Sequence, residues 1–358
     1  MAYQEPKKIL VIRLSSIGDI LLTTPLLRVL HRRFPEAQID FVIKTRFAEL
    51  MRNNPHLHEL LLLDTETGEE GLQELRRKIR MAGYDLVVDI HRNFRSFYLR
   101  RGLPGAVIAT YSKQMVRRFL LVRTGVNLYR EVIPVHQRYI RALRRWGIED
   151  DGLGLEFFID PQAERLISLR LAERSNARPL VGIAPGAGFA TKRWPAENFL
   201  EIARGLIREH QADILLLGNK ADRELTSPLA LALGAGVYDW AGTLTLQQSA
   251  AAVASCDLLI SNDTGLMHLA CALRVPVLAI FGPTTRELGF FPVGPESEVI
   301  ENEELSCRPC SHLGGERCPK DHFRCMREIL PAQLLARAGR MLERRRGSQT
   351  EKPQQTGG

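Results

Sequence analysis

Residues 257–284 carry the pattern that most restricts the fold of this chain, DLLISNDTGLMHLACALRVPVLAIFGPT. Leu258 to Ile260 and Val275 to Phe281 are short apolar runs without polar alternation, which is typical of strands covered on both faces of a parallel sheet. Between them, apolar residues from Met267 to Leu273 recur at helical spacing. The stretch therefore predicts a buried strand, a turn, a short helix and a second buried strand.

The turn in this stretch is built from Asn262, Asp263, Thr264 and Gly265, which lie where a strand leads into a helix N-terminus. Free backbone N–H groups and the positive end of the helix dipole favour an anion there, commonly a phosphate. A simpler alternative is that Asp263 caps its own helix, as Asp, Asn and Thr often do. A second phosphate-compatible loop in the same half of the chain favours the anion site.

That second loop is PGAGFATKRWP, from Pro185 to Pro195, and it follows the apolar run Leu180 to Ala184. It matches neither the Walker A pattern nor the dinucleotide-binding glycine pattern. Its small residues allow close backbone approach, and Thr191, Lys192 and Arg193 are suitable partners for a diphosphate. A plain connecting loop with a solvated Lys192 is the alternative.

Strand-like runs alternate with amphipathic helices through both halves of the 358 residues. This alternation predicts an α/β protein with two successive Rossmann-like domains, with a ligand site expected in the cleft between them. The predicted divisions are an N-terminal domain at residues 1–160, a linker region at 161–178, a C-terminal domain at 179–330, a final helix at 331–346 and a disordered polar tail at 347–358.

Asp19 follows the first predicted strand, Lys8 to Arg13, in the sequence LSSIGD. Ser16 and Asp19 have the spacing of a capping arrangement, which is a purely structural role for this carboxylate. The functional interpretation places Asp19 at the carboxyl edge of the strand, where open α/β sheets bind ligands. A carboxylate there can act as a general base.

The net charge of +8 is unevenly distributed. Between Arg92 and Arg145 the chain has thirteen Lys or Arg residues and one acidic residue, Glu131. Such a segment attracts polyanions, which include nucleic acid, an anionic membrane surface and an acidic small substrate. No apolar run is long enough to span a bilayer and the N-terminus lacks the pattern of a signal peptide, so we expect a cytoplasmic protein.

Four cysteines near the C-terminus, Cys307, Cys310, Cys318 and Cys325, have a spacing compatible with a structural zinc site. Reduced, packed cysteines are the alternative, because the spacing is not that of a standard zinc finger. Cys256 and Cys271 lie in apolar stretches and are predicted to be core residues.

Four segments together resemble glycosyltransferase family 9, the bacterial lipopolysaccharide heptosyltransferases. They are RLSSIGDILLTTP at residues 13–25, YDLVVDIHRNFRS at 84–96, PGAGFATKRWP at 185–195 and SNDTGLMHLACALRVPVLAIFGPT at 261–284. The cysteine segment is similar to that of second-heptosyltransferase-like members. The resemblance implies a GT-B fold, with an N-terminal acceptor domain and a C-terminal nucleotide-sugar domain.

The resemblance also implies an activity: inverting transfer of heptose from ADP-L-glycero-D-manno-heptose to the lipopolysaccharide inner core, without a catalytic metal. By position, Asp19 corresponds to the general base. Lys192 corresponds to a catalytic and donor-binding residue, and the other implied donor-binding residues are Thr191, Asp263, Thr264, Gly265 and His268. After Gly218 the chain has Asn219 and Lys220 where related sequences often carry an acidic residue, so Asp222 or Glu224 would have to recognise the nucleoside.

Charge rather than motif predicts the acceptor site, which we expect at Arg92, Arg95, Arg117 and His136. The implied partners are the ADP-heptose donor, the acidic inner-core acceptor and the anionic inner-membrane surface, and no nucleic acid is expected. Two other functions remain open from the sequence. One is a GT-B transferase or epimerase that uses another nucleotide diphosphosugar, and the other is a non-catalytic basic protein that binds RNA or a membrane.

Overall fold

The computed structural model describes residues 5–175, 177–294 and 296–350. They form two compact units. Unit 1 comprises residues up to 118, 129–160 and 287–290, and unit 2 comprises residues 119–128, 161–286 and those from 291 onward. Unit 1 therefore includes residues 287–290, and unit 2 includes residues 119–128. Domains predicted as unbroken stretches of sequence assign each of these two segments to the other domain.

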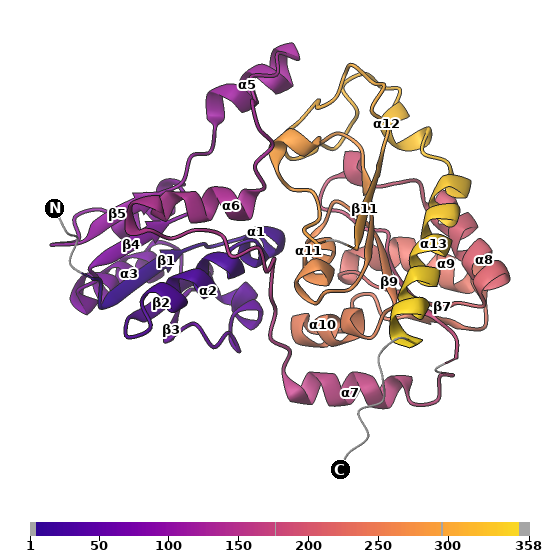
Figure 1. Cartoon of the computed structure of the whole chain (residues 1–358), viewed down its shortest axis with the longest axis horizontal. Helices are drawn as coiled ribbons and strands as arrows, with labels where there is room; N and C mark the ends of the chain where they lie inside the picture. Colours follow the sequence, from indigo (N-terminus) through magenta and orange to yellow (C-terminus); the bar gives the residue numbers. More distant parts are fainter. Residues whose placement is uncertain (1–4, 176, 295, 351–358) are drawn as a thin grey trace. The chain divides into compact units, whose positions relative to one another are not determined.

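Unit 1 is built on a five-stranded parallel sheet of order β3-β2-β1-β4-β5 (Figure 1). The strands are β1 (Lys8–Ile12), β2 (Gln38–Lys44), β3 (Glu59–Leu63), β4 (Leu86–Asp89) and β5 (Val107–Thr110). The helices are α1 (Ile17–Leu21), α2 (Thr24–Arg33), α3 (Gly68–Ala82), α4 (Phe94–Arg100) and α6 (Val135–Ile140), with 3-10 turns at Thr45–Leu50 and Arg141–Trp146. Helix α5 (Met115–Thr124) has residues in both units.

Helices α3 and α4 cover one face of the unit 1 sheet through a continuous apolar core. Leu75 and Ile79 of α3 are one helical turn apart and are both buried in this core. The helix ends at Gly83, whose φ of +68° is readily adopted by glycine. The positions of the apolar residues and the C-terminal glycine thus explain where α3 lies and stops.

Unit 2 is built on a six-stranded parallel sheet of order β11-β10-β9-β6-β7-β8. The strands are β6 (Leu180–Ala184), β7 (Asp213–Leu216), β8 (Val237–Asp239), β9 (Leu258–Asn262), β10 (Val277–Phe281) and β11 (Ser297–Glu301). The helices are α7 (Pro161–Leu171), α8 (Ala196–His210), α9 (Arg223–Leu233), α10 (Leu246–Ala254), α11 (Gly265–Ala272), α12 (Arg324–Arg327) and α13 (Pro331–Thr350), with 3-10 turns at Ala190–Lys192, Lys220–Asp222 and Arg286–Leu288.

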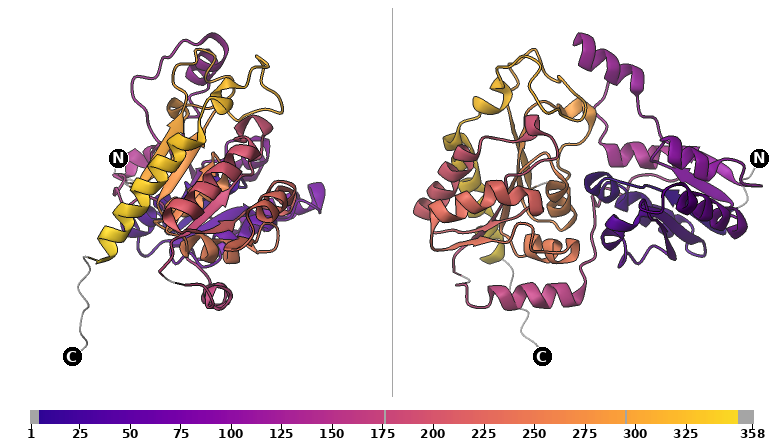
Figure 2. Two further views of the ribbon diagram at one scale, coloured as in Figure 1. Left: turned by 90° about the vertical axis from the view of Figure 1, so that its right-hand side faces the viewer. Right: turned by 180° about the vertical axis from the view of Figure 1, so that it is seen from behind.

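Both faces of the unit 2 sheet are covered. Helices α8, α9 and α13 share an apolar core with one face, and the two views agree that α13 and α8 lie side by side (Figure 1, Figure 2). Helices α10 and α11 contact each other on the opposite side, where α7 packs against α10. This double coverage explains why the strands read as apolar runs without alternation. The predicted α/β class with two Rossmann-like domains is confirmed.

Several predicted boundaries need correction. The apolar residues from Ile20 to Phe34 recur at helical spacing and predict one helix. This run is instead divided between α1 and α2, because Pro25 lies at the start of α2 and fits the first turn of a new helix. The final helix does not end at residue 346 but continues to Thr350, since Gly347 weakens a helix without terminating it and no proline intervenes. The rest of the tail predicted at 347–358, residues 351–358, lies outside the described residues.

Four of the helices and strands were not predicted from the sequence, namely α4, α12, β8 and β11. Each is short, and β8 and β11 are edge strands with only partly buried side chains, so they lack the long apolar run that marks the central strands. In the described part of the chain, none of the helices combines the length and apolar character needed to cross a bilayer.

Candidate active-site residues in the two units

In unit 2, the turn between β9 and α11 places an acidic side chain against a basic one. Lys192 Nζ lies 2.6 Å from Asp263 Oδ2, and these side chains are only 14% and 9% exposed. The Thr284 hydroxyl donates to the same Oδ2 at 3.1 Å. Asp263 is therefore not the cap of its own helix, which was the simpler of the two interpretations.

Thr264 is the N-cap of α11, and its hydroxyl lies 3.1 Å from the Ser261 hydroxyl. Among the described residues, Thr264 makes no side-chain cap hydrogen bond to this helix. The first N–H groups of α11 are consequently not capped by Thr264, and they add their dipoles to the charge of Lys192. This arrangement suits a diphosphate.

Asn262 fixes the loop that carries Lys192 to this turn. Its side chain accepts a hydrogen bond from Trp194 N at 3.1 Å and donates to Pro185 O at 2.8 Å. Asn262 is fully buried and Trp194 is nearly so, so both bonds are shielded from water. The sequence placed Asn262 in the turn but gave no indication of this bridging role.

The loop after β6 approaches Asp222, which follows β7, so closely that only glycine fits at position 186. A Cβ atom on Gly186 would lie 2.1 Å from Asp222 Oδ1. Asp222 is buried, and its Oδ2 accepts a hydrogen bond from Asn219 N at 2.8 Å. Asp222 therefore supports the loop, which leaves the exposed Glu224 as the remaining predicted candidate for contact with a nucleoside.

Two other predicted donor-site residues are buried. The Thr191 hydroxyl accepts a hydrogen bond from Gly315 N at 2.8 Å, and Thr191 N donates to Gly315 O at 3.0 Å. Thr191 thereby ties the Lys192 loop to the cysteine segment. His268 lies on α11 and is 3% exposed, while Gly265 begins that helix.

In unit 1, Asp19 lies in the first turn of α1 and has three side-chain partners. Arg13 Nη2 lies 2.6 Å from Asp19 Oδ1, and the Tyr139 hydroxyl donates to Oδ1 at 3.4 Å. The Ser16 hydroxyl and backbone N–H both donate to Oδ2, at 3.0 and 3.4 Å. The capping arrangement predicted from the sequence is present, but Asp19 also belongs to a buried cluster that the sequence did not predict.

The electrostatics of this cluster keep Asp19 ionised. Burial raises the pKa of Asp19, but Arg13 and the hydrogen bonds from Ser16 outweigh that effect and hold the pKa below its ordinary value. Burial raises the pKa of Tyr139 well above its ordinary value, so its hydroxyl keeps the proton that it donates. Arg13 is itself anchored by donating to Ile90 O at 2.8 Å.

Several cations gather near this cluster without matching acids. Burial and the positive charges of Arg46 and Arg95 lower the pKa of Lys44, which ends β2. Burial, Arg13 and Arg92 likewise lower the pKa of Lys113. Burial and neighbouring cations, Arg13 foremost, lower the pKa of His91 to about 3. The field at this edge of the unit 1 sheet is therefore positive and suited to anionic groups.

The four predicted acceptor residues occupy different environments. Arg92 and Arg95 are exposed and belong to this positive region, and Lys113 Nζ donates to Arg92 O at 2.9 Å. Arg117 is exposed on α5. His136 is 4% exposed, and its Nε2 lies 3.7 Å from Asp150 Oδ2. An acceptor contact for His136 remains a prediction.

The zinc site predicted from the cysteine spacing is not evident in the described structure. Among residues 5–175, 177–294 and 296–350, no group of three or more His, Cys, Asp or Glu side chains is placed to hold a metal ion. Cys325 lies in the apolar core of unit 2, and burial raises its pKa to about 12.

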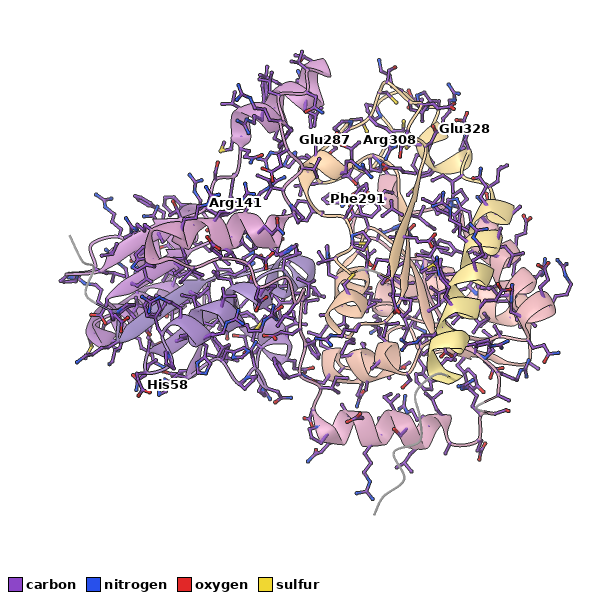
Figure 3. All side chains as sticks on the ribbon, viewed as in Figure 1. His58, Arg141, Glu287, Phe291, Arg308 and Glu328 are labelled. Carbon is purple, nitrogen blue, oxygen red and sulfur yellow. The ribbon has the colours of Figure 1, made fainter. Side chains whose placement is uncertain are left out.

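Arg308, which is labelled in Figure 3, ties this segment to the rest of unit 2. Its guanidinium contacts Glu301 Oε2 at 2.6 Å and donates to Thr284 O at 3.0 Å and to Gly282 O. Thr284 is the residue whose hydroxyl contacts Asp263. The cysteine segment therefore supports the same turn that holds Lys192.

The model of glycosyltransferase family 9, described as heptosyltransferases, matches residues 72–318. This chain belongs to glycosyltransferase family 9. It is therefore a glycosyltransferase of the heptosyltransferase family. Lipopolysaccharide heptosyltransferase 2 of Escherichia coli is 30% identical over 295 residues, covering 78% of this chain and 83% of that protein. Lipopolysaccharide heptosyltransferase 1 of Pseudomonas aeruginosa is 27% identical over 323 residues, covering 85% and 86%.

Solved structures of this family share the fold. A family 9 glycosyltransferase from Veillonella parvula superposes with a TM-score of 0.79 at 25% identity, covering 94% of this chain and 98% of that one. The E. coli ADP-heptose lipopolysaccharide heptosyltransferase II superposes with a TM-score of 0.73 at 24% identity, covering 95% and 99%. The two parallel sheets of this glycosyltransferase are thus those of a GT-B heptosyltransferase fold.

Proposed function

We propose that this glycosyltransferase transfers heptose from ADP-L-glycero-D-manno-heptose to the inner core of lipopolysaccharide, at the cytoplasmic face of the inner membrane. The transfer inverts the anomeric carbon and uses no catalytic metal. The observation that carries the proposal is the Lys192–Asp263 pair at the N-terminus of α11, in a chain whose relatives are lipopolysaccharide heptosyltransferases.

The donor half of the reaction is assigned to unit 2. As the bond between the anomeric carbon and the diphosphate breaks, its electron pair goes to the leaving ADP. Lys192 and the N–H groups at the start of α11 stabilise that charge, because cations and aligned dipoles that are already in place need no reorganisation. Asp263, Thr264, Gly265 and His268 shape this part of the site, and Thr191 holds the loop.

The acceptor half is assigned to unit 1. The acceptor hydroxyl forms the new bond to the anomeric carbon and gives its proton to Asp19. Because the pKa of Asp19 is held low, the carboxylate is ionised at neutral pH and the proton transfer becomes favourable only as the hydroxyl gains positive character. Arg92, Arg95 and Arg117, together with Lys44 and Lys113, are suited to phosphate or carboxylate groups of the acceptor.

The test is Asp19→Asn, which removes the base but keeps the size of the side chain. We expect transfer to fall by about a hundredfold to ten-thousandfold, the usual contribution of a general base, with ADP-heptose affinity nearly unchanged. Transfer is measured with purified inner-core acceptor, and donor affinity by calorimetry.

Ser16→Ala is the matched control, because it removes the capping partner of Asp19 and leaves the carboxylate in place. It should lower thermal stability slightly and keep most of the turnover. If Ser16→Ala loses as much turnover as Asp19→Asn, or if Asp19→Asn loses donor binding and turnover in parallel, Asp19 is a structural cap and not the base.

A further inference from the structure

Helix α5 exposes apolar side chains that a folded protein usually covers. Six of its ten residues are apolar in the sequence MVRRFLLVRT. Met115, Val116 and Phe119 are 62%, 71% and 62% exposed. Scattered single apolar residues on a surface are ordinary, but three of them on consecutive turns of one short helix form a patch.

These exposed residues lie together on one side of the helix. At about 100° per residue, Met115, Val116 and Phe119 fall within an arc of roughly 100°. Leu121 lies on the opposite side, about 200° from Phe119, and is only 6% exposed. The helix is therefore apolar on two sides and buried on one, which leaves the side centred on Phe119 available for a partner.

The charges on and beside this helix are mostly positive. Lys113, Arg117, Arg118, Arg123 and Arg130 lie within or beside α5, and the acidic residue nearest in the sequence is Glu131. That carboxylate is already paired, since Arg141 Nη2 lies 3.2 Å from Glu131 Oε1.

The loop after α5 extends the apolar character. Val126, Leu128 and Val132 are 49%, 46% and 44% exposed. Helix α5 itself, Met115–Thr124, thus combines exposed apolar side chains with three arginines and no acidic residue, and we call its exposed side the α5 surface.

We propose that the α5 surface docks on an anionic lipid bilayer, with Met115, Val116 and Phe119 in the headgroup region and Arg118 and Arg123 on lipid phosphates. Long arginine side chains reach the phosphates while an apolar face enters the interface. The proposal extends the proposed function. It rests on that function in one respect, namely that docking on a bilayer is useful to an enzyme whose acceptor is linked to lipid.

The positive charge of the α5 surface favours a bilayer over a second copy of this chain as its binding partner. In a symmetric dimer the same patch meets itself, so its arginines would face the arginines of the partner copy. An anionic bilayer instead supplies a continuous negative surface, and each Lys or Arg near such a surface strengthens binding about fivefold.

The experiment is vesicle co-sedimentation of the full-length protein, with phosphatidylcholine alone and with a phosphatidylcholine and phosphatidylglycerol mixture. We expect binding to the mixture, little binding to phosphatidylcholine alone, and weaker binding as salt rises. Phe119→Ser should weaken binding about tenfold, and Arg123→Gln about fivefold. Leu231→Ser is the matched control, because Leu231 is 88% exposed on α9, outside the α5 surface, and it should bind as the wild type does.

Three results would overturn the proposal: no binding of the wild type to either vesicle, equal binding to both, or a dimer that Phe119→Ser dissociates. A kinetic comparison separates this proposal from the proposed function. Phe119→Ser should reduce transfer to acceptor embedded in anionic vesicles while leaving transfer to delipidated inner-core oligosaccharide unchanged. If the wild type binds vesicles but transfers heptose to neither acceptor, the proposed function fails and the docking surface stands.

Discussion

The carboxylate of Asp19 illustrates how single residues in this enzyme are tuned by neighbours distant in the sequence. Burial alone would raise its pKa, yet Arg13 at 2.6 Å reverses the direction. The stabilisation that this pairing gives the folded state is fully present above the ordinary pKa of aspartate, and it is lost as the pH falls through the lower folded-state value. Arg13 is therefore a positioning residue that keeps Asp19 ionised and oriented.

Replacing Arg13 with Met tests this role through the pH profile. With the guanidinium gone, burial dominates and the pKa of Asp19 rises, so we expect the acid limb of kcat/KM to move upward by about one pH unit or more. Arg52→Met, at an exposed position of unit 1, should leave the profile unchanged. An unchanged profile in Arg13→Met, in a folded protein, would mean that Arg13 does not set the ionisation of Asp19.

A substitution at Lys192 is expected to affect donor binding and the departure of ADP. Lys192→Ala removes the cation proposed to stabilise the leaving ADP, so we expect kcat to fall about a hundredfold or more and donor affinity to weaken. Single-turnover rates and calorimetric titration with ADP-heptose measure the two effects separately. Lys320→Ala is the control, because Lys320 is exposed in the cysteine segment. Unaltered donor affinity and turnover would remove Lys192 from the active site.

At the scale of elements, the β9–α11 turn and the loop after β6 act as one structural piece. Asn262 at the end of β9 bonds to both ends of the residue 185–194 loop, and Thr191 bonds to Gly315 in the cysteine segment. The carboxyl ends of β6 and β9 are neighbours in the sheet, which brings the two connections together. The position of Lys192 in the loop after β6 therefore depends on the hydrogen bonds that Asn262 makes from the end of β9.

Asn262→Leu should loosen this assembly. It leaves the Trp194 N–H and the Pro185 carbonyl without their buried partners, which costs about 1 to 3 kcal/mol for each group. We expect a lower free energy of unfolding in denaturant titration and weaker donor binding. Asn53→Leu, at an exposed position, is the control. A stability equal to that of the wild type would show that these two bonds do not hold the loop.

On the scale of the whole molecule, the enzyme consists of two α/β units with complementary chemistry. Unit 1 contributes an ionised carboxylate in a positive field, which suits an anionic acceptor, and unit 2 contributes a lysine and a helix N-terminus, which suit a diphosphate donor. Glycosyl transfer requires both functions, because one substrate must lose a proton while the other loses a phosphate leaving group.

Nucleotide selectivity is a property of the intact enzyme that thermal unfolding can report. At a hundredfold excess over its dissociation constant, a ligand stabilises the folded state by about 2.7 kcal/mol. We expect ADP and ADP-heptose to raise the melting temperature more than UDP or GDP does. A preference for UDP or GDP would retain the fold and the roles of Asp19 and Lys192 but change the donor. No response to any nucleotide would count against the proposed enzyme activity.

Much of the fold could be predicted from the sequence because its determinants are local. Apolar runs mark the central strands, and the apolar residues of α8 (Ala196–His210) recur at helical spacing between Pro195 and Gln211. The polar turn after β9 and the loop after β6 were also visible as motifs. The edge strands β8 and β11 were not, because partly buried strands lack a distinctive local pattern.

The sequence by itself determined the strand and helix order, the family and the residues expected to bind a diphosphate, because short-range patterns and motifs carry that information. Only the tertiary structure decided which side chains lie next to one another. Tyr139 reaches Asp19 from 120 positions away, Lys192 pairs with Asp263, and Cys325 enters the apolar core. The reason is physical: burial and pairing depend on which distant segments pack together, and this packing sets the charge state of each side chain.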